Sequence, residues 1–177
     1  MGFSKHIYVL LLLTSCQSFV TGKTRIQDFA VKDREATVLF WWATQCPCVT
    51  RFQSRMEDLA ESYAGKSVAM FAVASNADES LEQVQRISQQ RQFKLPIIFD
   101  KNGVLAKQIG VYTTPTAVLL DSEGEVQFMG WIDNERMPGE KDRVPYLQNA
   151  LDQFLNQEKI TMPRAPIYGC PITKTLF

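Results

Sequence analysis

The chain reads Val38-Leu39-Phe40-Trp41-Trp42-Ala43-Thr44-Gln45-Cys46-Pro47-Cys48 where an apolar run gives way to a helical pattern. The run over 38–42 is continuously apolar, as expected of a strand that is covered on both faces of a sheet. From Val49 to Tyr63 the apolar residues recur at helical spacing. Cys46 therefore lies at the N-terminal end of a helix, where the macrodipole and unpaired backbone N–H groups stabilise a thiolate. Because the thiolate attacks disulfides and peroxides, this arrangement predicts thiol redox chemistry.

The remaining apolar pattern predicts alternating strands and helices. Their expected order is β-α-β-α-β-α-β-β-α, over 38–42, 49–63, 68–73, 81–87, 96–99, 105–109, 117–120, 126–131 and 144–155. A strand, a helix and a strand in this order make a parallel unit with a right-handed crossover. The last stretch, Thr161 to Phe177, holds three prolines and is expected to be an extended tail.

This order resembles the thioredoxin fold in its redoxin form, which carries an additional strand–helix insertion. The resemblance depends on Trp42-Ala43-Thr44-Gln45-Cys46-Pro47, on the Thr114-Pro115 pair, and on the hairpin directly after that pair. It covers roughly residues 24–155. It implies an α/β fold with a central mixed sheet and helices on both faces.

The resemblance also implies roles for individual residues. Cys46 matches the attacking cysteine of the thioredoxin-like proteins, and Trp42 is expected to border it. Pro115 is expected to follow a cis peptide bond and to pack against Cys46, so that Thr114 presents its backbone to an extended substrate. No bound organic cofactor is implied.

The second thiol departs from the family pattern. Family members usually have two residues between their cysteines, whereas Cys48 follows Cys46 after one, and Val49 stands where the second thiol is expected. A Cys46–Cys48 bond would close so short a loop that it strains disulfide geometry. Alternatively, Cys170 in the tail resolves a bond made by Cys46, or a structural Cys48–Cys170 bridge pins the tail. The sequence leaves these three pairings open.

Composition narrows the function further. Of the four cysteines, three remain once Cys16 is set aside, and an odd number leaves one thiol free or exchangeable. His6 is the only histidine and belongs to the expected signal segment, which argues against a Ser/His/Asp triad, a Cys/His pair or a histidine-bearing zinc site. The 19 basic and 19 acidic residues balance, which argues against nucleic acid as a partner.

The N-terminus has the pattern of an export signal. Lys5 precedes an apolar run over 7–13, which is too short to span a bilayer. Leu13-Thr14-Ser15-Cys16 resembles the lipobox of bacterial lipoproteins, in which the cysteine is acylated. The expected organisation is a signal peptide over 1–15, a tether over 16–24, a redoxin domain over 25–158 and a tail over 159–177. The expected location is the bacterial cell envelope, with the protein facing the periplasm or the exterior and anchored by lipid on Cys16.

Two arginines, Arg51 and Arg55, lie four residues apart on the first helix. We expect them to be surface partners of Asp58 or Glu61, although Arg51 is also placed to favour a nearby thiolate. Residues 76–79, which begin with Asn76, are expected to cap the second helix.

These observations favour a membrane-tethered thiol–disulfide oxidoreductase that exchanges with protein thiols or disulfides. Cys46 would attack, and Cys48 or Cys170 would release the product. A peroxiredoxin-like peroxidase acting on a small peroxide is the first alternative, although such enzymes usually have a threonine or serine three residues before the cysteine, and Thr44 stands two before it. A Cu(I) carrier that uses the soft thiol ligands is the second. A thioredoxin-like domain kept only for binding is the third.

Overall fold

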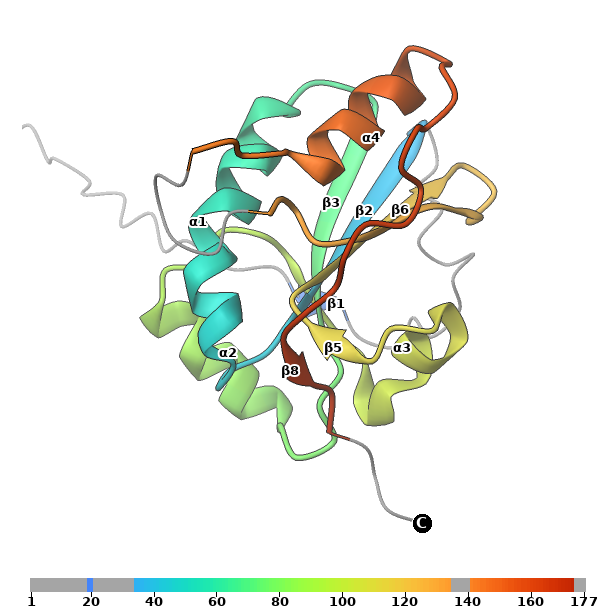
Figure 1. The fold of residues 1–177 in the computed structure, drawn as a ribbon. Coiled ribbons are helices and arrows are strands. Elements are labelled where there is room, and N and C mark those ends of the chain that lie inside the picture. The colour runs from blue at the N-terminus through green and yellow to red at the C-terminus, as the bar shows by residue number, and fades with distance from the viewer. Residues whose placement is uncertain (1–18, 21–33, 135–140, 174–177) are drawn as a thin grey trace, which may run out of the picture.

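A mixed β-sheet runs through the middle of the molecule (Figure 1). The computed structural model describes residues 19–20, 34–134 and 141–173. Six strands lie in the order β1-β4-β3-β2-β6-β7, with β1, β4, β3 and β2 parallel and with β6 and β7 antiparallel to their neighbours. Their bounds are β1 Phe19–Val20, β2 Ala36–Trp42, β3 Val68–Ala74, β4 Ile97–Phe99, β6 Thr116–Asp121 and β7 Val126–Gly130.

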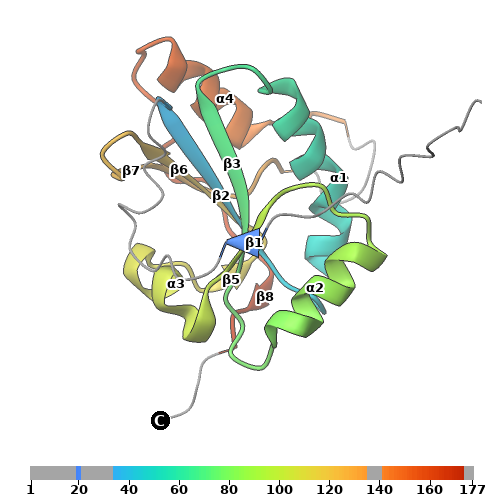
Figure 2. The same ribbon diagram turned by 180° about the vertical axis from the view of Figure 1, so that it is seen from behind.

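Helices cover both faces of this sheet, as the two views in Figures 1 and 2 show. The helices are α1 Pro47–Ser62, α2 Leu81–Gln90, α3 Val104–Ile109 and α4 Tyr146–Leu155, with a short 3-10 turn at Lys101–Gly103 before α3. Alternate residues of β2 point to opposite faces, so Phe40 packs with α1, α2 and α4, while Leu39 and Trp41 pack with α3. All seven residues of β2 are buried, which explains the apolar run that predicts it.

The C-terminal segment returns across the molecule to the start of α1. Backbone hydrogen bonds join it first to β7, where the Ala165 N–H donates to the carbonyl oxygen of Met129 at 3.0 Å. A Cβ on Gly130 would collide with Ala165, so glycine at this position permits the close approach. Farther on, the two-residue strand β8 (Cys170–Pro171) pairs antiparallel with β5 (Thr113–Thr114). The tail is extended, as predicted, but it is hydrogen-bonded to the domain rather than loose.

The structure matches the predicted order of elements and corrects three details. Phe19–Val20, inside the expected tether, pairs with β4 as strand β1. The short strands β5 and β8 were not predicted. The second helix is capped by Ser80, whose hydroxyl accepts from the Gln83 N–H at 3.1 Å, and not by the 76–79 segment.

Several expectations concern residues outside the described part of the chain. The expected signal peptide over 1–15 and Cys16, the expected site of the lipid, both lie there. Among the helices of the described residues, none has the length and apolar character needed to cross a bilayer.

Candidate active site at the start of the first helix

Cys46 is the N-cap residue of α1, and Pro47 is the first residue inside the helix. Proline suits this position because its ring presets a helical φ and it lacks an N–H that would have no partner there. Cys46 has extended backbone angles, and its carbonyl oxygen accepts the Thr50 N–H at 3.2 Å. The sulfur therefore lies at the positive end of a sixteen-residue helix, as the sequence predicts.

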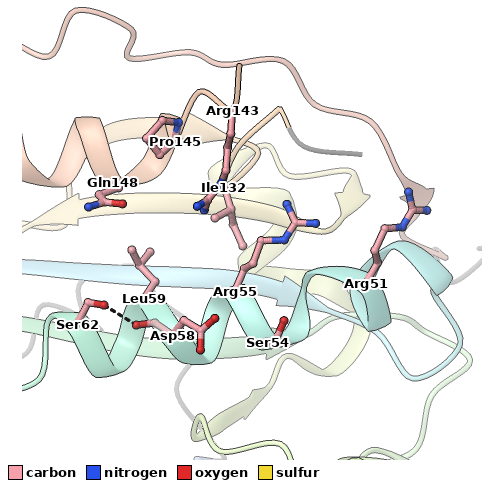
Figure 3. Close-up of a pocket in the computed structure, with 10 residues that line it drawn as sticks. All are labelled: Arg51, Ser54, Arg55, Asp58, Leu59, Ser62, Ile132, Arg143, Pro145 and Gln148. Atoms are coloured by element: carbon pink, nitrogen blue, oxygen red, sulfur yellow. Dashed lines mark hydrogen bonds between the residues drawn. The ribbon is translucent and has the colours of Figure 1, made fainter. Parts of the chain in front are cut away.

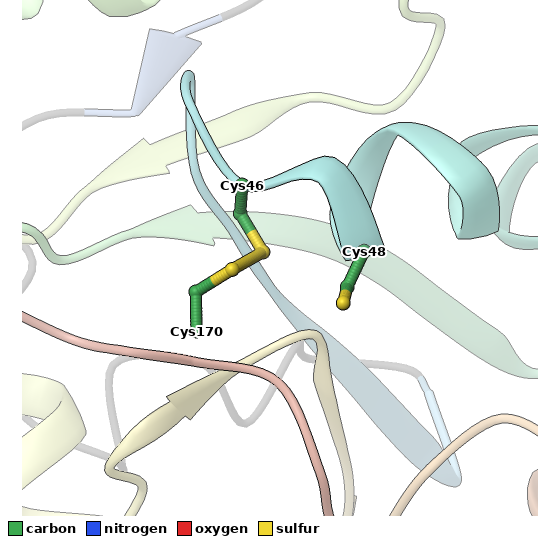
Figure 4. Close-up of side chains that lie close together, drawn as sticks. All are labelled: Cys46, Cys48 and Cys170. Atoms are coloured by element: carbon green, nitrogen blue, oxygen red, sulfur yellow. A yellow bond between two sulfur atoms is a disulfide. The ribbon is translucent and has the colours of Figure 1, made fainter.

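A disulfide joins Cys46 to Cys170, across 124 residues of chain, with 6.0 Å between the two Cα atoms (Figure 4). Of the three pairings that the sequence leaves open, the structure contains this one. The expected alternatives, a Cys46–Cys48 ring and a Cys48–Cys170 bridge, are absent because Cys48 is the free thiol among the described cysteines. Cys46 is 3% exposed, whereas Cys48 and Cys170 are half-buried.

Gly169 lets the tail come this close. A Cβ at this position would overlap the carbonyl oxygen of Thr114, on the strand that pairs with β8. The glycine beside the tail cysteine is therefore a steric requirement for docking. The Gly169-Cys170 dipeptide is visible in the sequence. The need for glycine could not be explained without knowing where Thr114 lies.

The loop at Thr114 and Pro115 also lies against Cys46. The Thr114–Pro115 peptide bond is cis, as the resemblance predicts. The Thr114 carbonyl oxygen is 3.3 Å from the Cys46 sulfur, so a reduced Cys46 thiol is placed to donate to it. Such a hydrogen bond favours the protonated thiol, while the helix N-terminus favours the thiolate, and the two act in opposite directions on the Cys46 proton.

Cys48 lies in the first turn of α1 and contacts Arg51. The Arg51 guanidinium nitrogen is 3.9 Å from the Cys48 sulfur. This contact matches the second expectation for Arg51, a place beside a nearby thiol, and its side chain extends toward the helix N-terminus. The prediction that Arg55 is a surface partner of Asp58 or Glu61 is wrong, since its side chain is 11% exposed and pairs with Asp133 in the segment after β7.

A buried carboxylate supports the loop that leads into Cys46. Glu79 is 7% exposed, and its Oε1 accepts from the backbone N–H and the hydroxyl of Thr44, both at 2.7 Å. Arg91 donates to the carbonyl oxygen of Thr44 at 2.6 Å. Burial lowers the pKa of Arg91 below its ordinary value, and the negative charge of Glu79 acts in the opposite direction. The sequence placed Glu79 in the expected capping segment and did not single out Arg91, because nothing local distinguishes either residue from a surface charge.

Trp42 and Asn76 have partners that the sequence did not predict. Trp42 is fully buried in the same core cluster as Cys46, and its ring stacks on Phe93 with 5.7 Å between centroids. Asn76 accepts from the Thr173 N–H at 3.0 Å and donates to Glu79, so it holds the tail just after β8 rather than capping a helix.

A pocket of about 330 Å³ lies along α1, one turn beyond Cys48 (Figure 3). Three arginines border it, Arg51, Arg55 and Arg143, together with the carboxylate of Asp58. Arg55 and Arg143 both bind Asp133, which is fully buried, so part of this positive charge is already neutralised.

Three sulfurs gather at this site. The Cys46, Cys48 and Cys170 sulfurs lie within 4.8 Å of one another. Thiolates are the ligands that Cu(I) prefers. In the oxidised form described here two of the three are bonded to each other, so only a reduced protein would offer all three to a metal.

The chain is similar in sequence to a protein named a thiol-disulfide oxidoreductase. The ResA thiol-disulfide oxidoreductase of Bacillus thuringiensis subsp. konkukian is 32% identical over 104 residues, which are 59% of this chain and 57% of that protein. The chain thus spans little more than half the length of this curated relative.

Two solved structures are similar in fold. A hypothetical protein of Sinorhizobium meliloti superposes with a TM-score of 0.73 at 27% identity, covering 85% of this chain and 84% of the other. A protein of Neisseria meningitidis proposed to be a thioredoxin superposes with a TM-score of 0.55 at 20% identity, covering 69% and 75%. The thioredoxin-like α/β fold expected from the sequence is thereby confirmed.

One family model covers most of the domain. The match runs over residues 14–129 and so includes Cys46 and Cys48, whereas Cys170 lies beyond it. Because these residues make up more than half of the chain and carry the helix-capping cysteine, the protein belongs to the AhpC/TSA family.

Proposed function

We propose that the protein is a thiol–disulfide oxidoreductase in which Cys46 attacks and Cys170 resolves. The observation that carries the proposal is the disulfide between a cysteine at a helix N-terminus and a cysteine on a docked tail, beside a cis-proline loop. The similarity to proteins named thiol-disulfide oxidoreductases supports the same chemistry.

The reaction proceeds by two exchanges. The Cys46 thiolate attacks one sulfur of a substrate disulfide, which forms a mixed disulfide and releases the first substrate thiolate. The Cys170 thiolate then attacks the Cys46 sulfur, which forms the Cys46–Cys170 bond and releases the second substrate thiolate. A protein dithiol donor returns both cysteines to the reduced form by the same chemistry in reverse order.

Substrate access requires the tail to move. In the oxidised form Cys46 is buried under the segment around Cys170, and the Thr114 backbone is already paired with it through β5 and β8. Reduction removes the covalent link, so the tail segment can leave and an extended substrate chain can take its place along Thr114. Pairing of a substrate strand with an exposed strand edge is a common mode of peptide recognition.

The test is reduction of insulin disulfides with dithiothreitol as the donor. We expect the wild-type protein to accelerate the reaction, Cys46→Ser to abolish the acceleration, and Cys170→Ser to accelerate it less, because dithiothreitol must then release the mixed disulfide from Cys46. Full activity of Cys46→Ser would overturn the proposal.

A peroxidase is the alternative that the family assignment keeps open, with Cys46 oxidised by peroxide and Cys170 resolving the sulfenic acid. We place the peroxidase second because of one observation. The Thr44 hydroxyl, the nearest upstream hydroxyl, donates to Glu79 at 2.7 Å and is therefore engaged away from a peroxide at Cys46. Consumption of hydrogen peroxide in step with thiol oxidation, without insulin reduction, would favour this alternative.

A Cu(I) carrier is the second alternative, because the three clustered sulfurs supply suitable ligands once reduced. Metal analysis of the protein prepared under reducing conditions distinguishes it: one copper retained against a competing chelator would support a carrier, and loss of all copper would exclude it.

We further propose that Cys16 is acylated and anchors the protein in the bacterial cell envelope. The support is the sequence around Leu13-Thr14-Ser15-Cys16. A lipid would hold the redox domain at the membrane without a spanning helix. In cells, we expect the protein in the membrane fraction and the Cys16→Ser variant outside it, and equal partition of the two would contradict this proposal.

A further inference from the structure

Cys48 is the sulfur that the two-cysteine mechanism leaves unused. It is a free, half-buried thiol in the first turn of α1, and its sulfur lies within 4.8 Å of both sulfurs of the Cys46–Cys170 disulfide (Figure 4). A disulfide bond is about 2.05 Å long. The Cys48 sulfur therefore needs to move by less than about 3 Å to bond with either of them, which is within the reach of a side-chain rotation.

A cation and the end of a helix lie beside the Cys48 sulfur. Arg51 contacts the sulfur at 3.9 Å, and the helix N-terminus lies beside it. Cys46 occupies the same helix end as the N-cap residue. If negative charge moves from the Cys48 sulfur to the Cys46 sulfur, it therefore stays beside the same peptide dipoles. The free energies before and after such a thiol–disulfide exchange are then similar.

We propose that Cys48 is a third redox thiol that attacks the Cys170 sulfur and takes over the disulfide. The Cys48–Cys170 bond forms, the Cys46–Cys170 bond breaks, and the bonding electron pair leaves on Cys46 as a thiolate. No external oxidant or reductant is consumed, because one disulfide and one thiolate are present before and after. The inference rests on the proposed function and deepens it by adding a catalytic thiol.

Attack at Cys170 rather than at Cys46 follows from the chain. A Cys46–Cys48 bond would close a ring with only Pro47 between its cysteines, in the first turn of a helix, whereas Cys170 approaches from a separate strand. The consequence is that the disulfide moves away from Cys46, which is 3% exposed, to two half-buried cysteines. A reducing partner can reach the bond there while Cys46 is already released.

The test maps the bond in the oxidised protein alone. The full chain, with Cys16→Ser to remove an unrelated thiol, is oxidised to one disulfide, held at neutral pH and labelled with N-ethylmaleimide. Tryptic digestion leaves Cys46 and Cys48 in one peptide, and fragmentation on the N-terminal side of Pro47 separates them. We expect label on Cys46 together with a Cys48–Cys170 bond, in a share that grows as the label removes free Cys46.

Two variants and one control variant test the role of Cys48 further. Arg51→Gln should slow the appearance of label on Cys46 several-fold, whereas Arg86→Gln, an exposed arginine on α2, should leave it unchanged. Cys48→Ser should slow reduction of the Cys46–Cys170 bond by dithiothreitol about tenfold, because the internal attack is faster than the external one.

Label found on Cys48 alone at all times, or on Cys170, would overturn the inference. The outcome is independent of the insulin assay. If the disulfide moves but the protein does not reduce insulin, only the proposed function is rejected. If the protein reduces insulin but the disulfide does not move, only the role of Cys48 is rejected.

Discussion

At the residue scale, the absence of a side chain at Gly169 controls whether Cys170 reaches Cys46. We expect Gly169→Ala to displace β8 from β5, because the added Cβ would overlap the Thr114 carbonyl oxygen. The loss of stability should be about 1–3 kcal/mol, as for other substitutions that strain a packed backbone. Mapping of disulfides after air oxidation should show less of the Cys46–Cys170 bond.

Gly65→Ala is the matched control. Gly65 has a positive φ of 82°, but a Cβ there would meet nothing within 4 Å. Its cost is confined to backbone strain of about 1 kcal/mol. Disulfide yield should stay at the wild-type level, and an equal fall in both variants would refute a specific role for Gly169.

The apolar run and the helical pattern after it predicted that Cys46 lies at the start of a helix, and the resemblance to the thioredoxin fold predicted the cis Thr114–Pro115 bond. The sequence did not single out the Cys46–Cys170 pair, since 124 residues separate the two cysteines and only the folded tail brings them together. For Arg51, the sequence favoured a surface ion pair over a contact with a thiol. Spacing along a helix does not show toward which end of the helix a long side chain extends, so the contact with Cys48 was the less favoured expectation.

At the element scale, a buried ion pair joins α1 to the segment after β7. The Arg55 guanidinium binds Asp133, whose side chain is fully buried, and Arg143 binds the other oxygen of the same carboxylate at 3.0 Å. Arg55→Met should cost about 3–5 kcal/mol in the free energy of unfolding, because it leaves the buried carboxylate without its more buried partner.

Arg143→Met provides the comparison, since 44% of the Arg143 side chain is exposed. Solvent already screens the ion pair between Arg143 and Asp133. The substitution should therefore lower the free energy of unfolding by about 1 kcal/mol or less. Urea denaturation of the two variants measures both values. A larger loss for Arg143→Met than for Arg55→Met would contradict the assignment.

A second link joins the end of α1 to α4. The Tyr63 hydroxyl, in a buried side chain, donates to the Asp152 carboxylate. Burial, and then the hydrogen bond and charge of Asp152, raise the pKa of Tyr63 well above its ordinary value of 10.0. The folded protein therefore keeps a proton that the unfolded chain loses near pH 10, so this contribution is present below pH 10 and is lost as pH rises further.

Tyr63→Phe tests this pH dependence. The variant should be less stable at neutral pH, and its stability should fall less steeply above about pH 10 than that of the wild type. Tyr112→Phe, which changes an exposed tyrosine, should keep the wild-type slope. Parallel slopes for wild type and Tyr63→Phe in urea titrations at alkaline pH would rule out the coupling.

Long elements were predicted well because their apolar periodicity reports burial directly. The strand β2 and the helices α1 and α4 are examples, with boundaries within about two residues. The strands β1, β5 and β8 have two residues each, too few for any period, and exist because a distant segment pairs with them.

At the scale of the whole molecule, the disulfide ties the C-terminal tail to the beginning of the first helix. It closes a loop of 124 residues, which in the chain-entropy view lowers the entropy of the unfolded protein. Reduction should therefore lower the free energy of unfolding by about 2–5 kcal/mol. Urea denaturation with and without reductant measures this. Cys170→Ser should match the reduced protein, while an oxidised protein no more stable than the reduced one would refute the structural link.

The proposed function requires that Cys46 is the thiol that attacks. The direct measurement mixes two reduced variants with a disulfide-bonded peptide, quenches with acid and follows the mixed disulfide by mass spectrometry. Cys48→Ser/Cys170→Ser keeps Cys46, and the matched Cys46→Ser/Cys170→Ser keeps Cys48. We expect the peptide to bond to Cys46 faster than to Cys48. Equal or faster bonding to Cys48 would contradict the assignment of Cys46 as the attacking thiol.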